Sequence, residues 1–308
     1  MSLAFVFPGQ GSQSVGMLKD LAAEFAEVEA TFKQASDALG YDLWEVVQNG
    51  PAEKLNQTDI TQPAMLSAGV AVWRIWQARG GAQPVMMAGH SLGEYTALVC
   101  AGALDFRDAV KLVAERGRLM QQAVPAGEGA MAAILGLDDD AVIQVCTDAA
   151  EGEVLSAVNF NSPGQVVIAG QKSAVERALV VAKEKGAKRA LLLPVSVPSH
   201  CALMKPAAEK LAKILADMEI RKPAIPVINN VDVQAQNSAD EIRAALVKQL
   251  HNPVRWVEII QAMAADGVDS LIVCGPGKVL AGLNKRIERG MSVQAVFNPD
   301  TLGSALQS

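Results

Sequence analysis

The sequence Gly89-His90-Ser91-Leu92-Gly93 constrains the fold more than any other stretch of this chain. A short apolar run, residues 85–88, precedes it, and an amphipathic stretch, residues 92–100, follows it, which predicts a strand, a tight turn and a helix. A Gly-x-Ser-x-Gly sequence in that setting is typical of a nucleophile elbow, whose sharp turn exposes the serine hydroxyl. We therefore predict that Ser91 is a nucleophile and that the N–H of Leu92 points toward an oxyanion. An ordinary serine in a tight turn is the alternative.

The composition predicts an α/β protein. Half of the 308 residues are hydrophobic and only 4% are aromatic. Ala, Val, Leu, Ile and Gly dominate, which suits a core of parallel strands covered by helices. The length allows one large domain, or one with a smaller companion.

Charge and motif content exclude several classes of function. The formal charge of −6 argues against a nucleic-acid partner. No apolar stretch is long enough to span a membrane and no signal peptide is visible, so we expect a cytoplasmic protein without a membrane partner. Four cysteines without CxxC spacing, and three histidines without an HExxH motif, predict no metal site.

Two helices can be placed by their caps. Thr61 is predicted to cap an apolar helix that has Pro63 in its first turn and ends at Gly80-Gly81. Asp105 is predicted to cap a second helix that runs to about residue 123.

Arg116 is out of place on that second helix, because it falls on the apolar face with Ala109, Val113 and Met120. A guanidinium that points inward must find an anion. An internal Asp or Glu and the carboxylate of a substrate are both possible partners at this stage.

Residues 129–195 show a pattern of predicted strands and helices that differs from the rest of the chain. The pattern is β-α-β-β-α-β, the order of a ferredoxin-like unit, and it follows a linker-like stretch at residues 125–128. Strand–helix alternation resumes afterwards. We therefore predict a catalytic domain of residues 1–126 and 197–308, with a ferredoxin-like subdomain inserted at residues 127–196.

A nucleophilic serine needs a base, for which the chain offers three histidines. His90 is next to Ser91 and is expected to point elsewhere. His200 lies between a strand and a helix after the predicted insertion, and His251 lies in a loop. Either could be the base, and either could be a loop histidine without a catalytic role. The turn after the first strand, residues 8–13, could supply a second oxyanion donor from a backbone N–H.

Several segments together resemble the malonyl-CoA:acyl carrier protein transacylases of bacterial fatty acid synthesis, and the resemblance covers nearly the whole chain. It rests on FVFPGQGSQ (5–13), TQPA (61–64), AGHSLGEYTAL (88–98), ERG (115–117), NFNSPGQVVIAG (159–170), VPSH (197–200), NP (252–253) and GPGKVL (275–280).

The resemblance implies a hydrolase-like α/β domain with a ferredoxin-like insertion. It implies that Ser91 takes the acyl group, that His200 is the base, and that a carbonyl near the NP segment, here that of Gln249, orients the histidine. It also implies an oxyanion hole formed by the N–H groups of Gln10 and Leu92.

For the substrates, the resemblance implies that Arg116 holds the malonyl carboxylate. Malonyl-CoA and acyl carrier protein are the expected partners. No cofactor is expected, since the coenzyme A thioester is itself a substrate.

Two alternatives come from other classes. A serine esterase or thioesterase of the α/β-hydrolase class would need an acid between Ser91 and a late histidine such as His251. A non-enzymatic module that docks a carrier protein would not need Ser91, His200 and Arg116 together, and the presence of all three argues against it.

Overall fold

The computed structural model describes residues 2–195 and 197–307; the predicted domain boundary at residue 196 and the predicted domain ends at residues 1 and 308 lie outside them. The elements along the chain are β1 (Leu3–Phe7), α1 (Lys19–Glu24), α2 (Ala26–Leu39), α3 (Leu43–Asn49), α4 (Ala52–Leu55), α5 (Thr58–Ala78), β2 (Met86–Gly89), α6 (Leu92–Cys100), α7 (Phe106–Ala123), β3 (Gly129–Leu135), α8 (Asp139–Ala150), β4 (Leu155–Ser162), β5 (Gln165–Gln171), α9 (Lys172–Glu184), β6 (Arg189–Leu192), the 3₁₀-helix Ala202–Met204, α10 (Lys205–Ala216), β7 (Val227–Ile228), α11 (Ala239–Gln249), α12 (Trp256–Ala265), β8 (Ser270–Cys274), α13 (Val279–Ile287), β9 (Ser292–Val296) and α14 (Pro299–Leu306).

The larger sheet is entirely parallel, with strand order β7-β2-β1-β8-β9. Both of its faces are buried, as the side chains of β1 show. Phe5 and Phe7 join a core with α2, α5, α6 and α7, whereas Ala4 and Val6 join a second core with α12 and α13. This is the period-2 alternation of a strand between two helical layers. The predicted α/β fold with a parallel sheet is confirmed.

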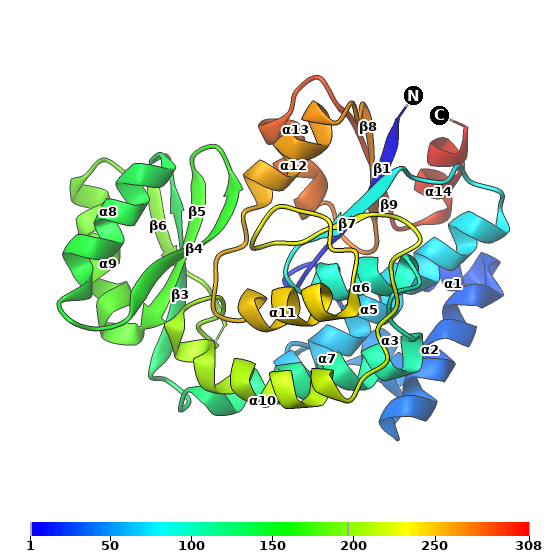
Figure 1. The fold of residues 1–308 in the computed structure, drawn as a ribbon, viewed down its shortest axis with the longest axis horizontal. Coiled ribbons are helices and arrows are strands. Elements are labelled where there is room, and N and C mark those ends of the chain that lie inside the picture. Colours follow the sequence, from blue (N-terminus) through cyan, green and yellow to red (C-terminus); the bar gives the residue numbers. More distant parts are fainter. Residues whose placement is uncertain (1, 196, 308) are drawn as a thin grey trace.

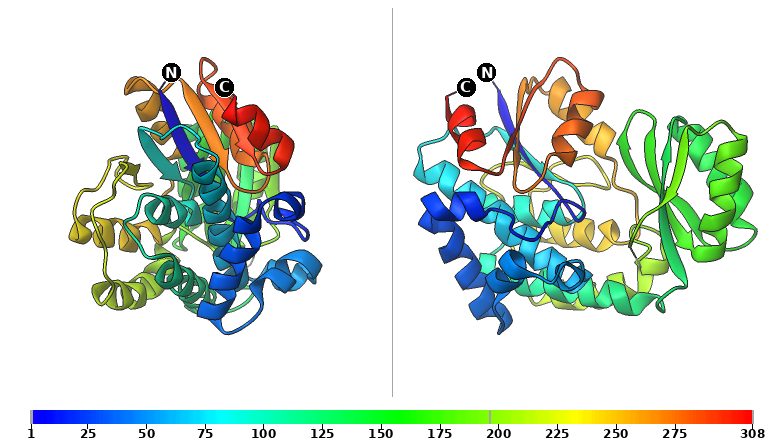
Figure 2. Two further views of the ribbon diagram at one scale, coloured as in Figure 1. Left: turned by 90° about the vertical axis from the view of Figure 1, so that its right-hand side faces the viewer. Right: turned by 180° about the vertical axis from the view of Figure 1, so that it is seen from behind.

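The smaller sheet is antiparallel, with strand order β4-β5-β3-β6. The order of elements is β-α-β-β-α-β, as the sequence pattern predicts. Side chains from β3 and β5, such as Ile134 and Ile168, pack with Val142 of α8 and Val175 of α9 in a separate core. This sheet and its two helices lie to one side of the remaining elements (Figures 1 and 2).

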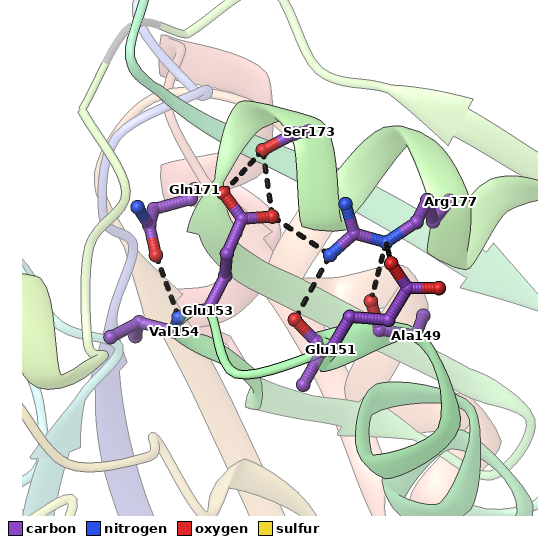
Figure 3. A network of polar contacts seen from close by, with 8 residues as sticks. Ala149, Glu151, Glu153, Val154, Gln171, Ser173 and Arg177 are labelled. Carbon is purple, nitrogen blue, oxygen red and sulfur yellow. Dashed lines mark hydrogen bonds and ion pairs between the residues drawn. The ribbon is translucent and has the colours of Figure 1, made fainter.

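A polar network holds one end of this smaller unit together (Figure 3). Arg177 of α9 donates from Nη2 to the Glu153 carboxylate over 2.7 Å and from Nε to the Ala149 carbonyl over 2.9 Å. Ser173 donates to the same carboxylate over 2.7 Å. The network therefore ties the end of α8 and the segment before β4 to the first turns of α9.

The cap prediction is right for one helix and wrong for the other. Asp105 accepts hydrogen bonds from two N–H groups in the first turn of α7, so this cap is confirmed. Helix α5 instead begins at Thr58, because the extended residue that precedes it is Gln57. Thr61 is therefore inside the helix and buried, where its hydroxyl lies 2.5 Å from the carbonyl oxygen of Leu55 and 3.0 Å from that of Gln57.

None of the helices in the described part of the chain is both long and apolar enough to cross a bilayer. The cytoplasmic location stays a prediction.

The strands β1 and β2 meet the helix α6 too closely for side chains at two points. A Cβ atom at Gly89 would lie 1.8 Å from the carbonyl carbon of Gly93, and a Cβ atom at Gly93 would lie 2.1 Å from the carbonyl oxygen of Phe7. Both glycines of the Gly-x-Ser-x-Gly sequence are therefore required by contact with backbone, which cannot move aside as a flexible side chain can. This close packing fixes Ser91 at the carboxyl edge of the parallel sheet, where open α/β sheets bind ligands.

We expect Gly93→Ala to lower the free energy of unfolding by about 3 kcal/mol or more, since the added methyl overlaps backbone. Gly282→Ala, in the interior of α13, is the matched control. Its added Cβ would meet nothing within 4 Å, so it should raise stability by about 0.5–1 kcal/mol. Urea unfolding of the two variants is the measurement. A Gly93→Ala protein as stable as wild type would contradict this account of the elbow.

Candidate active site

Ser91 lies between β2 and α6 in a strained backbone conformation, with φ 51° and ψ −107°. A positive φ costs a non-glycine residue about 1–3 kcal/mol and persists only where the surroundings hold it. Two side chains do so here. The N–H of Ser91 donates to Oδ1 of Asn230 over 2.7 Å, and its carbonyl accepts from Nε2 of Gln249 over 3.0 Å.

His200 faces the Ser91 hydroxyl. Its Nε2 lies 2.8 Å from Ser91 Oγ, and its Nδ1 lies 2.7 Å from the carbonyl oxygen of Gln249. A carbonyl can only accept, so Nδ1 carries the ring proton and the lone pair of Nε2 faces the hydroxyl. His200 also has a positive φ of 66°, and its backbone N–H donates to the carbonyl oxygen of Leu250 over 3.0 Å.

The environment of His200 keeps the ring neutral. Burial, and after it the positive charge of Arg116, lowers the pKa of His200 to about 3. The hydrogen bond to Gln249 opposes this shift but is the smaller effect. At neutral pH the imidazole is therefore an unprotonated acceptor.

The other two histidines lie elsewhere. His90 Nε2 is 2.8 Å from Oδ1 of Asn161 in β4, and its ring packs against Trp256. Within residues 2–195 and 197–307, His251 makes no hydrogen bond to Ser91, and its buried Nδ1 has no partner. Of the three histidines, His200 is the one that the fold brings to Ser91.

Arg116 of α7 is completely buried, with a relative exposure of 0%. Its Nη1 donates to Oε1 of Gln62 over 2.8 Å, and its Nη2 to Oε1 of Gln249 over 3.0 Å. The same Nη2 lies 3.4 Å from Ser91 Oγ. The guanidinium carbon lies 5.2 Å from the ring centroid of Tyr95, a cation–π contact.

The charge of Arg116 has no ion-pair partner among the described residues, and its Nε has no acceptor there. Burial lowers the pKa of Arg116, which is the direction expected when the charged form is desolvated. Of the two partners considered from the sequence, an internal carboxylate in direct contact is therefore not found in this part of the chain.

A polar network behind the site was not predicted from the sequence. It centres on Glu94, which is only 2% exposed. Glu94 Oε2 accepts from Nε2 of Gln249 and from the backbone N–H of Asn230, each over 2.9 Å. Burial raises the pKa of Glu94 to about 7.

The turn after β1 lies against the elbow. The N–H of His90 donates to the Phe7 carbonyl over 3.0 Å, and a Cβ atom at Gly9 would lie 2.5 Å from the His90 carbonyl oxygen. The backbone N–H groups of Gln10 and Leu92 have no acceptor within the described residues, so both can donate to a ligand.

No set of three or more His, Cys, Asp or Glu side chains in the described ranges is arranged to hold a metal ion.

Comparison with known proteins agrees with this geometry. The model of the acyl transferase domain family matches residues 4–296. The malonyl CoA-acyl carrier protein transacylase of Escherichia coli K12 is 62% identical over 304 residues, which cover 99% of this chain and 98% of that protein.

Two solved structures are similar over their whole length. The acyl carrier protein S-malonyltransferase of Vibrio cholerae is 63% identical with a TM-score of 0.97, covering 99% of each chain. A malonyl-transacylase solved in complex with its type II PKS acyl-carrier protein is 59% identical with a TM-score of 0.99, covering 100% of this chain and 99% of the other. The chain belongs to the acyl transferase domain family.

Proposed function

We propose that this chain transfers the malonyl group from malonyl-CoA to the phosphopantetheine thiol of acyl carrier protein through a malonyl ester on Ser91. One observation carries the proposal. The Ser91 hydroxyl lies 2.8 Å from the acceptor nitrogen of a neutral histidine and 3.4 Å from a buried guanidinium that has no ion-pair partner in the described residues. A nucleophile, a base and an anion receptor therefore meet at one point, and the names and identities of the relatives support the same reaction.

In the first half-reaction, Nε2 of His200 takes the hydroxyl proton while Ser91 Oγ attacks the thioester carbonyl. The N–H groups of Gln10 and Leu92 donate to the oxyanion of the tetrahedral intermediate. Collapse of the intermediate breaks the C–S bond, and His200 returns its proton to the coenzyme A sulfur. The malonyl group is then an ester of Ser91 Oγ.

The second half-reaction runs the same steps in reverse. The carrier thiol gives its proton to His200, and its sulfur attacks the ester carbonyl. The C–O bond to Ser91 breaks, and the hydroxyl regains the proton. The carbonyl of Gln249 suffices to orient His200, since it fixes the tautomer without a carboxylate.

Through the charge of Arg116, the basicity of His200 depends on whether the bound substrate has a carboxylate. After burial, the positive charge of Arg116 is the largest cause that lowers the pKa of His200. A malonyl carboxylate paired with the guanidinium neutralises that charge, so the imidazolium that must form during attack is repelled less. An acetyl group leaves Arg116 unpaired and the repulsion in place.

The domain organisation is proposed with the function. Residues 127–196 form a ferredoxin-like subdomain inserted into a hydrolase-like α/β domain of residues 1–126 and 197–308. The antiparallel sheet order β4-β5-β3-β6 and its separate core support this division.

Mass spectrometry after mixing with malonyl-CoA tests the ester intermediate. We expect a malonyl adduct that maps to Ser91, persists without carrier protein, and is absent in Ser91→Ala. An adduct of undiminished yield in Ser91→Ala would exclude Ser91 as the acyl acceptor. Rapid release of free malonate from wild type would instead support a thioesterase.

A comparison of two histidine variants tests the base. His200→Ala should lose transfer activity by about 10²–10⁴-fold, the usual cost of removing a general base. His251→Ala should stay close to wild type, because that ring does not contact Ser91. The rate of Ser91 malonylation under identical conditions decides the matter. A larger loss in His251→Ala would reverse the assignment.

Arg116→Ala tests whether the guanidinium binds the substrate carboxylate. Removing one partner of a desolvated charge pair costs about 2–5 kcal/mol, or about 30- to 5,000-fold in rate. Arg116→Ala should lose kcat/KM for malonyl-CoA by about that range and lose much less with acetyl-CoA. The measurement is the ratio of kcat/KM for the two thioesters in wild type and variant. An unchanged ratio would assign Arg116 a structural role only.

A further inference from the structure

The buried carboxylate of Glu94 is not used by the mechanism above, although it lies directly behind the reacting groups. It is 2% exposed, and it forms no ion pair in the described part of the chain. A carboxylate in such a place is costly unless hydrogen bonds compensate it. The two hydrogen bonds that it accepts come from Gln249 and Asn230, which both contact active-site residues.

The first hydrogen bond leads to His200. Glu94 Oε2 accepts from the side-chain Nε2 of Gln249 over 2.9 Å. The same amide nitrogen donates to the Ser91 carbonyl over 3.0 Å, and the backbone carbonyl of Gln249 lies 2.7 Å from His200 Nδ1. Glu94 therefore fixes the residue that orients the base.

The second hydrogen bond leads to the elbow. The same Oε2 atom accepts from the backbone N–H of Asn230 over 2.9 Å. The side chain of Asn230 in turn accepts from the N–H of Ser91 over 2.7 Å and donates to the Gly89 carbonyl over 2.7 Å. One oxygen atom thus connects Gln249, whose carbonyl orients His200, with Asn230, whose side chain holds the strained turn that carries the nucleophile.

We infer that Glu94 is a positioning residue for the transfer reaction, which sets the distance between Ser91 and His200 by holding Gln249 and Asn230 at a single oxygen atom. The inference rests on the proposed function, because the distance matters only if His200 takes the proton of Ser91. According to this inference, the site needs an acceptor oxygen at the position of Glu94 Oε2 and does not need a negative charge there.

Two conservative variants separate the oxygen from the charge. Glu94→Gln keeps the length of the side chain, so its amide oxygen can accept both donors. Its NH₂ group takes the place of Oε1, which has no hydrogen-bond partner in the described residues. Glu94→Asp keeps the charge but is one methylene shorter and cannot reach both donors. Leu98→Ala, a core change on the same helix α6, is the control for loss of stability alone.

The readout is the single-turnover rate of Ser91 malonylation at saturating malonyl-CoA, together with the concentration that gives half of that rate. Small misplacements of reacting groups cost up to about 100-fold. We expect Glu94→Asp to be slower than wild type by about 30- to 100-fold, and Glu94→Gln to stay within about threefold of it, with the half-saturating concentration unchanged in both.

A fast Glu94→Asp with a slow Glu94→Gln would overturn the inference, because charge would then be the requirement. It would also be overturned if neither variant were slower than Leu98→Ala, or if both were slow. Wild type is measured in parallel: if it forms no Ser91 adduct at all, the proposed function fails, and that result is distinct from any difference among the variants.

Discussion

The hydrogen bond between Nδ1 of His200 and the carbonyl of Gln249 is the interaction on which the site depends. Because a carbonyl has no proton to give, this bond leaves the lone pair of Nε2 toward Ser91. No carboxylate touches the imidazole in the described part of the chain. The site therefore differs from a Ser-His-Asp arrangement in that a neutral carbonyl group orients the base, whereas Arg116 and Glu94 both contact the side chain of Gln249.

Arg116 and Glu94 act on the buried site in different ways. Burial, and after it the charge of Arg116, lowers the pKa of His200, so the resting ring is neutral. The side chain of Gln249 lies between them, accepting a hydrogen bond from Arg116 and donating one to Glu94. Ser91 and His200 both have positive φ angles, and this surrounding network over-determines two conformations that would otherwise be costly.

The features of the fold and the site that could be predicted from the sequence are those set by residues close together in the chain. The glycines around Ser91, the Asp105 cap and the inward face of Arg116 follow from short-range spacing, and the structure contains all three features. Glu94 and Asn230 are 136 residues apart in sequence. Their meeting arises from the packing of α6 near the end of β7, which no periodicity records. The predicted start of α5 is wrong because Thr61 and Pro63, two residue types that favour a helix start, lie inside the helix here.

The most direct test of the account is the protonation state of His200, measured by ¹⁵N NMR of histidine-labelled protein at pH 5.5 and pH 8, with His200→Ala to assign the signal. The account predicts a neutral ring with the proton on Nδ1 at both values, because burial and Arg116 lower the pKa of His200 to about 3. A protonated imidazolium at pH 5.5, or a neutral ring with its proton on Nε2, would contradict it.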